Sequence, residues 1–436
     1  MLSRRTLLHS AGSLLAAATV GGCANLATGL RPGGTGVHGT VQHMAWSSNE
    51  EERQLYVRLF ERFEQKYPDQ SVQYIHAPND YQTKVQAMMA GRILPDLFWA
   101  DVTYAPQWFP SGQLQPLDDI IAEYPELTAG FVPGLLEYGK GKDGVQYSIP
   151  KDYNPVVLYY NPEMFDQAGI DHPTPELTLD RFAELMAELT VRENGVTKRF
   201  GAAYDNSAPV WLQFIGNMGG ECFVDERSRF SDETVRDALA YMTRLYRAGY
   251  APNPVATQQA GQTAIQMFIL GRAAMLLSGK WEVPELRRAM ELPWEVTEAP
   301  IGTRRISTVQ SGMLTLAKGT PRMENAILLL RHMLSYEGME IVNGGGLSIP
   351  PYTRMIDDPR IINEPPSVDA FVASQHYVGY ESQLQLARSE RYNEFVGKYA
   401  QPELDNIFSF RKTVTEGTAD LDEAANSGLF ATIEAS

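Results

Sequence analysis

The sequence contains very little cysteine, which limits how the fold can be held together. Only two cysteines, Cys23 and Cys222, occur among the 436 residues. They do not form a CxxC motif, so neither that kind of redox site nor a cysteine-rich zinc site is expected. Because Cys23 lies in a terminal segment that we expect to be processed, Cys222 has no partner for an internal disulfide. A packed core must therefore stabilise the fold.

Catalytic and nucleotide-binding motifs are also missing. The chain has no GxSxG, HExxH, GxGxxG or complete P-loop motif. Its seven histidines never pair at the spacing of metal ligands, so we expect no metal site and no cofactor. No residue is predicted to be catalytic. A glycosidase needs two neighbouring carboxylates, and Asp101 and Asp152 could form such a pair, so an enzyme stays open as an alternative.

Positive charge and long apolar runs are scarce as well. The chain has 37 lysines and arginines against 53 acidic residues, which gives a net charge of −16. So acidic a surface argues against nucleic acid and anionic membranes as partners. No stretch beyond the first 22 residues reaches the roughly 18 apolar residues that a membrane-spanning helix needs.

The first residues have the pattern of an export signal. Arg4 and Arg5 precede an apolar stretch, and small residues lead to Cys23, which predicts a signal peptide over residues 1–22. The start resembles a twin-arginine signal. The four residues that end at Cys23 resemble a bacterial lipobox, which predicts an exported protein anchored to the membrane by a lipid on Cys23; the alternative is plain cleavage. Residues 23–39 are rich in glycine and predict a flexible linker.

About 400 residues then remain, more than one hydrophobic core usually serves, so two lobes are expected. Short apolar strands alternate with segments of helical periodicity; for example, a strand over 41–46 precedes a helix that starts at Glu50 and stops at Pro68. This alternation predicts an α/β fold with largely parallel sheets.

Several polar and aromatic residues fall at the ends of predicted strands. Trp46, Asp101 and Trp281 each follow such a strand, and Lys151 begins a polar group before another. In open α/β sheets, ligands bind beyond the carboxyl ends of the strands, so these residues are candidates for one crevice. The chain is also rich in tryptophan and tyrosine. Aromatic faces suit the apolar faces of sugar rings, and polar side chains suit the hydroxyls.

Four segments, together with the export signal, resemble one known family. They are LPDLFWADVTYAPQWFPSGQLQPLDD, YSIPKDYNPVVLYYNPEMFDQAGI, GRAAMLLSGKWEVPEL and GGLSIPPYTR, in this order along the chain. The sequence resembles the sugar-binding branch of the bacterial extracellular solute-binding proteins (family 1), the receptors of ABC importers. The resemblance implies a two-lobed periplasmic-binding-protein (Venus flytrap) fold, type II-like, with three hinge crossings.

The resemblance also implies where the chain changes lobes. Lobe 1 would comprise residues 40–148 and 313–346, and lobe 2 residues 154–300 and 353–436. The hinges would lie near 149–153, 301–312 and 347–352. Ligand binding would favour a closed state by rotation about these segments.

Fourteen ligand-binding residues follow from the resemblance. They are Trp46, Ser47, Asn49, Glu50, Tyr81, Asp101, Asp152, Tyr153, Trp211, Trp281, Glu282, Gly312, Tyr352 and Arg354. Several also have a structural alternative, such as core packing for Trp46 and Trp211. For Glu282 the alternative is an acid placed at the positive end of a helix.

The implied partners are a sugar and the membrane permease subunits of an ABC importer, with the receptor itself a monomer. The candidate positions offer acids and aromatics rather than clustered arginines, which favours a neutral sugar or short oligosaccharide over a phosphate ester. Two alternatives stay open. One is the same fold binding a glycerol phosphodiester or another small solute, and the other is a secreted glycan hydrolase or lyase.

Overall fold

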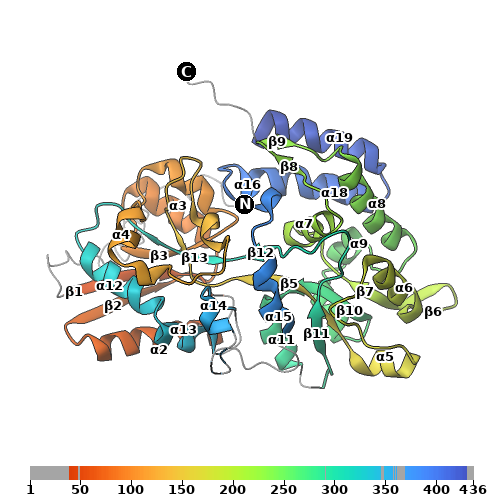
Figure 1. The fold of residues 1–436 in the computed structure, drawn as a ribbon, viewed down its shortest axis with the longest axis horizontal. Coiled ribbons are helices and arrows are strands. Elements are labelled where there is room, and N and C mark those ends of the chain that lie inside the picture. Colours follow the sequence, from red (N-terminus) through yellow and green to blue (C-terminus); the bar gives the residue numbers. More distant parts are fainter. Residues whose placement is uncertain are drawn as a thin grey trace, which may run out of the picture.

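The computed structural model describes residues 39–47, 50–289, 291–344, 348–356, 358, 360 and 369–429. Its elements form two groups, on the left and right of Figure 1. Each group surrounds one of the two large sheets, so we call them the first and second lobes. Among these residues, no helix has both the length and the apolar character needed to cross a membrane.

The first lobe combines the amino-terminal elements with a later return of the chain. Its sheet has the strand order β2-β1-β3-β13-β4. The elements are β1 (Gly39–Ala45), α2 (Glu50–Lys66), β2 (Gln70–His76), α3 (Tyr81–Gly91), β3 (Leu97–Asp101), η1 (Ala105–Ser111), α4 (Asp118–Glu123), η2 (Pro125–Leu127), η3 (Leu135–Gly139), β4 (Ile149–Pro150), β13 (Gly312–Leu316), α12 (Met323–Met333), α13 (Tyr336–Asn343) and α14 (Thr353–Ile356).

The second lobe has a sheet with the order β11-β5-β10-β7-β6, and β12 pairs with β5. Its elements are β5 (Asn154–Tyr160), α5 (Pro162–Ala168), α6 (Leu179–Leu189), β6 (Val191–Glu193), β7 (Val196–Ala203), α7 (Ala208–Asn217), β8 (Phe223–Val224), β9 (Arg227–Ser228), α8 (Glu233–Arg247), α9 (Pro254–Gln259), α10 (Ala264–Ile269), β10 (Ala273–Gly279), η4 (Lys280–Glu282), α11 (Val283–Arg288), β11 (Glu295–Glu298) and β12 (Val309–Gln310).

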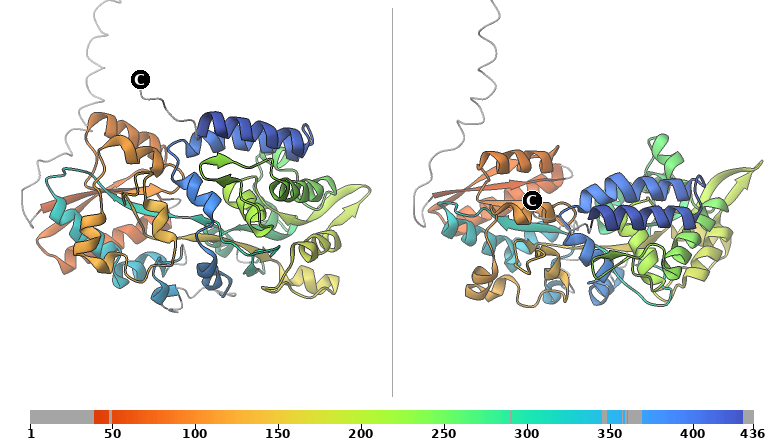
Figure 2. Two further views of the ribbon diagram at one scale, coloured as in Figure 1. Left: turned by 45° about the horizontal axis from the view of Figure 1, so that its top comes forward. Right: turned by 90° about the horizontal axis from the view of Figure 1, so that it is seen from above.

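The carboxyl-terminal helices complete the second lobe. In both rotated views they stay beside the middle part of the chain (Figure 2). They are α15 (Asp369–Ala373), η5 (Ser374–Tyr377), α16 (Glu381–Ala387), α17 (Tyr392–Glu394), the π-helix η6 (Phe395–Ala400), α18 (Gln401–Phe408), α19 (Val414–Ala424) and the π-helix η7 (Ala425–Leu429).

The expected α/β class is confirmed, but the prediction of largely parallel sheets is wrong. In the first lobe β1 is parallel to β2 and β3, whereas β13 is antiparallel to β3 and β4. In the second lobe β10 is parallel to β7 but antiparallel to β5. The cause is the direction of the crossings: β5 and β13 run into their lobes from the junction, whereas β3 and β10 run toward it.

Two crossings between the sheets are short and lie side by side. Ile149–Pro150 pairs with β13 in the first sheet, and from Asn154 the chain pairs in the second. The return is shorter still: Val309–Gln310 pairs with β5, and Gly312 already pairs with Asp101 of β3. Residues 151–153 and Ser311 therefore connect the two lobes.

The predicted third hinge passes the same place but does not yet leave the first lobe. Ile349 forms a bridge with Tyr153 of the first crossing. Beyond it, the backbone N–H of Val132 donates to the carbonyl of Pro351, and that of Thr353 donates to Gly130. Thr353 and α14 are thus held against the first lobe, so we propose that the lobe boundary lies after α14 rather than at 353.

The second lobe has a large aromatic core that includes Trp211. Every residue of α7 is buried, and Trp211 has no exposed surface. Its ring lies 6.0 Å from that of Phe230, centroid to centroid. The side chain therefore packs between α7 and the loop before α8, within the core of the second lobe.

Replacing Trp211 with alanine tests this placement. Because a fully buried indole would leave a cavity, we expect the free energy of unfolding to fall by about 3–5 kcal/mol. Urea denaturation of the purified protein measures the change. Leu270→Ala is the control, since Leu270 is 62% exposed and its loss should change stability by less than about 0.5 kcal/mol. Equal, small effects of both substitutions would contradict the buried position.

Candidate ligand-binding site

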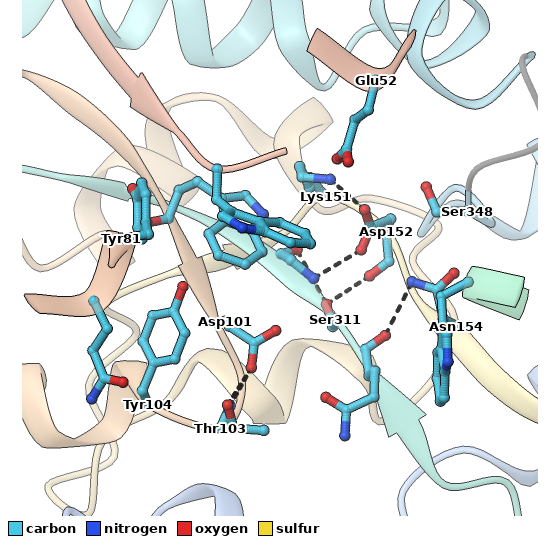
Figure 3. Close-up of a pocket in the computed structure, with 16 residues that line it drawn as sticks. Glu52, Tyr81, Asp101, Thr103, Tyr104, Lys151, Asp152, Asn154, Ser311 and Ser348 are labelled. Atoms are coloured by element: carbon cyan, nitrogen blue, oxygen red, sulfur yellow. Dashed lines mark hydrogen bonds and ion pairs between the residues drawn. The ribbon is translucent and has the colours of Figure 1, made fainter. Parts of the chain in front are cut away.

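A cavity of about 620 Å³ lies where the two lobes and their crossings meet (Figure 3). It is lined by Trp46, Glu52, Tyr81, Gln82, Trp99, Asp101, Thr103, Tyr104, Lys151, Asp152, Asn154, Trp281, Gln310, Ser311, Gly312 and Ser348. Most of these residues lie in or just after β1 and β3, or at the crossings and the strand ends that adjoin them. The volume suits a small organic ligand.

Stacked aromatic rings form the first-lobe wall of the cavity. The indoles of Trp46 and Trp99 stack with centroids 5.5 Å apart and an interplanar angle of 29°. The Tyr81 ring packs edge-on against the indole of Trp99, with ring centroids 5.4 Å apart. The Tyr81 hydroxyl donates to the Trp99 carbonyl at 2.6 Å. Trp46 Nε1 donates to the carbonyl of Pro78 at 3.1 Å. These contacts hold the rings in fixed positions beside the cavity.

Asp101, the last residue of β3, contributes a carboxylate to the same wall. The backbone N–H and the hydroxyl of Thr103 both donate to its Oδ1, at 2.8 and 2.5 Å. Burial raises the pKa of Asp101, and the nearby negative charge of Asp152 raises it further, while the bonds from Thr103 lower it. A partly desolvated carboxylate at a cavity wall is a strong acceptor for ligand hydroxyls.

The cavity floor is a hydrogen-bonded junction of the first two crossings. Lys151 and Asp152 form an ion pair in which both residues are buried. Asp152 Oδ1 accepts from the backbone N–H of Gly312 at 2.8 Å, and its carbonyl accepts from the Ser311 hydroxyl at 2.6 Å. Burial alone would lower the pKa of Lys151, but the charge of Asp152 outweighs it and the pKa is raised. Lys151 therefore remains a cation.

Gly312 is required by the packing of this floor. A Cβ at this position would lie 2.4 Å from Trp99 Nε1 and 2.9 Å from Lys151 Cε. A glycine at a ligand site commonly lets a ligand approach the backbone closely. In the structure the space is taken by two neighbouring side chains, so Gly312 lines the cavity while also admitting the aromatic wall and the lysine.

The second lobe faces the cavity with Trp281, which follows β10. Its Nε1 donates to Glu282 Oε1 at 3.0 Å, and the hydroxyl of Ser278 donates to the same oxygen at 2.7 Å. Glu282 is 9% exposed and lies behind Trp281, outside the lining. The predicted ligand contact of Glu282 is therefore not supported; its carboxylate contacts the tryptophan instead.

The lining combines aromatic faces with an excess of negative charge. Three acids, Glu52, Asp101 and Asp152, line the cavity together with one lysine. That lysine, Lys151, is paired with Asp152. No group of three or more histidines, cysteines or acids in the described ranges could hold a metal ion. Such a surface can stack on a ring and accept hydrogen bonds from hydroxyls.

Six of the predicted ligand-binding residues meet in this cavity. They are Trp46, Tyr81, Asp101, Asp152, Trp281 and Gly312. The prediction that strand ends from different parts of the chain share one crevice therefore agrees with the geometry. Lys151, which the sequence placed beside Asp152 at the crossing, lines it as well.

Tyr153 lies on the opposite side of the crossing and does not line the cavity. It is fully buried, and its backbone N–H donates to the carbonyl of Ile349 at 2.9 Å. Side chains alternate along an extended segment, so Asp152 and Asn154 face the cavity while Tyr153 faces the core. Tyr153 thus packs within the hinge, the structural alternative.

Trp211, Tyr352 and Arg354 are also placed away from the cavity. Trp211 belongs to the core of the second lobe. Tyr352 is 1% exposed, and its hydroxyl donates to the carbonyl of Leu127 at 2.9 Å within the first lobe. The Arg354 guanidinium lies over the Tyr352 ring, 5.6 Å from its centroid, and is exposed. The third hinge therefore brings neither Tyr352 nor Arg354 to the site.

The polar run after Trp46 also contributes less than predicted. Ser47 is buried, with its hydroxyl 2.6 Å from His76 Nε2. Glu50 is exposed at the start of α2 and accepts from Arg53 Nε at 2.7 Å. Asn49 and Cys23 lie outside the described residues, as do the predicted signal peptide and residues 23–38 of the linker.

Sequence reasoning missed several lining residues, of which Trp99 is the most important. Trp99 and Asp101 are two positions apart in β3, and this alternation places them on the same face. That signal was present in the sequence. Glu52 and Gln82 come from the first turns of α2 and α3, and their approach to the cavity depends on how those helices pack.

The burial of Glu282 predicts a pH-dependent effect of Glu282→Gln on stability. Burial raises the pKa of Glu282 from 4.5 to about 7. Between these values the folded state binds a proton that the unfolded state has lost, so the stability of the native protein falls as pH rises. Glutamine removes this titration. We therefore expect the variant to gain as much as about 3 kcal/mol relative to the native chain between pH 4.5 and 8.

Urea denaturation at the two pH values measures this difference. Glu285→Gln is the matched control, because Glu285 lies on the neighbouring helix α11 and is less buried. Its stability relative to the native protein should change little with pH. A Glu282→Gln difference that stays constant from pH 4.5 to 8 would contradict the raised pKa.

Two characterised relatives match parts of the chain. An arabinooligosaccharide-binding protein from Halalkalibacterium halodurans is 24% identical over 206 residues, which cover 46% of this chain and 44% of the relative. An sn-glycerol-3-phosphate-binding periplasmic protein from Agrobacterium fabrum is 27% identical over 107 residues, 24% of this chain and 23% of the relative. The chain thus aligns with less than half the length of either relative.

Solved structures show the same fold over almost their full length. An ABC substrate-binding protein from Listeria monocytogenes in complex with cycloalternan superposes with a TM-score of 0.76 and 21% identity, covering 89% of this chain and 98% of that one. Maltose-bound MalE3 of T. maritima superposes with a TM-score of 0.73 and 19% identity, covering 89% and 99%. The expected two-lobed periplasmic-binding-protein fold is confirmed.

The family model for bacterial extracellular solute-binding proteins matches residues 47–340. This range includes the second sheet, every strand of the first sheet except β1, the first two crossings and nearly all of the residues that line the cavity. The match covers well over half of the chain, and it confirms the resemblance drawn from the sequence. The protein belongs to the bacterial extracellular solute-binding protein family, whose members bind solutes and are not enzymes.

Proposed function

We propose that the protein is a lipid-anchored extracytoplasmic receptor that binds a sugar or short oligosaccharide and delivers it to the permease subunits of an ABC importer. The observation that carries the proposal is the cavity between the lobes, with stacked indoles on one wall, Trp281 facing from the other lobe and carboxylates between them. Aromatic faces pack on the apolar faces of sugar rings, and carboxylates accept their hydroxyls.

The names of the relatives support a carbohydrate ligand. One relative binds arabinooligosaccharides, and the two superposed structures hold cycloalternan and maltose. The relative that binds sn-glycerol 3-phosphate supports the alternative of a phosphate ester. The charges of the cavity weigh against that alternative, because three acids line it and Lys151 is paired with Asp152. An anionic ligand would meet repulsion there.

A thermal-shift screen tests the ligand class. We expect maltose, arabinotriose or D-tagatose to raise the melting temperature, and sn-glycerol 3-phosphate to have no effect. A saccharide at 100 times its dissociation constant would add about 2.7 kcal/mol to the free energy of unfolding. Stabilisation by sn-glycerol 3-phosphate and by none of the saccharides would reverse the assignment.

Trp281→Ala tests the site itself by isothermal titration calorimetry with the best saccharide. Loss of a stacking face should weaken binding about tenfold, which corresponds to about 1.4 kcal/mol. Phe410→Ala is the matched control, because Phe410 is a similarly exposed aromatic residue that does not line the cavity. Its affinity should equal that of the native protein. An unchanged affinity in Trp281→Ala would remove this residue from the site.

The proposed anchor rests on the lipobox-like sequence that ends at Cys23, and it has a separate test. In bacteria that express the full chain, radiolabelled palmitate should enter the native protein but not Cys23→Ser. The native protein should sediment with membranes, whereas the variant should lose that association. Absence of label from the native protein, with a cleaved and freely released product, would favour the alternative of plain cleavage.

A further inference from the structure

Trp281 is the second lobe's principal contribution to the cavity. Apart from residues of the crossings and of the strands that continue them, the described lining contains only this side chain from that lobe. Its indole is 36% exposed, although it is a large apolar group. A ring so exposed needs something to fix its orientation if it is to present one face to a ligand.

Two independent features fix this indole. The first is a hydrogen bond from its Nε1 to Glu282 Oε1, an oxygen that the Ser278 hydroxyl also binds. The second is the absence of a side chain at Gly279: a Cβ there would lie 1.9 Å from the six-membered part of the ring. The indole therefore folds back across the end of β10, with Glu282 holding its polar edge.

Polar and charged groups surround Glu282 on several elements. On β10 its neighbour is Ser278, and on its own turn the neighbours are Trp281 and the fully buried Lys280. Two further acids act on Glu282 from other elements: Asp205, which follows β7, and Glu285 on α11. Arg287, also on α11, acts on Lys280. The hydroxyl of Tyr159 on β5 donates to the Gly279 carbonyl at 2.8 Å. Burial is the largest influence and raises the pKa of Glu282 to about 7, aided by Asp205.

We propose that Glu282 is a positioning residue of the saccharide site: it holds the Trp281 indole in its cleft-facing orientation, and the charge on its carboxylate determines how firmly the indole is held. The effect on saccharide affinity rests on the proposed function, whereas the contact between Glu282 and the indole does not. Glu282 itself lies outside the lining of the cavity, so it would act on a ligand only through Trp281.

A change in pH would then act on the ligand through the tryptophan. An ionised carboxylate accepts a stronger hydrogen bond than a neutral carboxyl group does. Above about pH 7 Glu282 is ionised and the indole is held firmly; below that pH the carboxyl group is protonated and the bond weakens. Saccharide affinity therefore falls as pH falls.

The first test needs no ligand. The indole N–H signals of the six tryptophans are followed by ¹H–¹⁵N TROSY spectra as pH is varied, and Trp281→Phe identifies the signal of Trp281. We expect this signal to shift with a midpoint near pH 7 in the native protein, and at a slightly lower pH in Glu285→Gln, because the charge of Glu285 contributes a little to the raised pKa of Glu282. In Glu282→Gln it should not titrate. A Trp281 signal that is independent of pH in the native protein, or that titrates equally in Glu282→Gln, would overturn the proposal.

The second test measures the affinity for maltose, arabinotriose or D-tagatose, whichever gave the largest thermal shift. Native affinity should rise about threefold from pH 6 to pH 8, the effect expected of one hydrogen bond strengthened by charge. Glu282→Gln should keep the lower value at both pH values, and Glu282→Leu should bind about tenfold more weakly than the native protein at pH 8. Glu285→Gln should behave like the native protein.

The two tests separate the possible failures. Asp101 also lines the cavity and has a raised pKa, so a pH dependence that persists in Glu282→Gln would belong to Asp101 and would refute the inference. If none of the saccharides binds, the proposed function fails, whereas the spectra still decide whether Glu282 holds the indole.

Discussion

The buried contacts of Asp152 join the two lobes, and the rest of the site depends on them. Its carboxylate pairs with Lys151 and accepts from the backbone of Gly312, so it ties the outgoing crossing to the returning one. Removing one partner of a buried pair leaves an uncompensated charge, which is far more costly than the pair itself. The same contacts form the floor of the cavity. Connection of the lobes and construction of the site are thus one feature.

The cavity is built at some cost to stability. Burial raises the pKa values of Asp101 and Glu282 and lowers that of Lys280 to about 7, which means that each charge is less favourable there than in water. Buried ionisable groups with shifted pKa values lower stability, and they are typical of functional sites. In this protein they lie in or next to the contact region of the two lobes.

The sequence predicted the residue types of the candidate site better than it predicted which of the candidate residues are buried in the core. Trp46, Asp101 and Trp281 could be found because a strand followed by a polar turn is a local pattern. Trp211 and Tyr352 have equally suitable side chains, but long-range packing buries them in the core of one lobe or the other. The directions of β5 and β13 were likewise not predictable locally, since they follow from the way the crossings enter each sheet.

The unequal lining of the cavity has a consequence for the order of ligand release. The first lobe, the crossings and the adjoining ends of β5 and β12 supply nearly all of the lining, whereas the rest of the second lobe adds one indole face. Rotation of the second lobe would break that contact first and would leave the ligand bound to the first lobe. Departure would then occur in two kinetic steps, and a transporter that pulls the lobes apart would still have to compete with the half-site on the Trp46 and Trp99 wall.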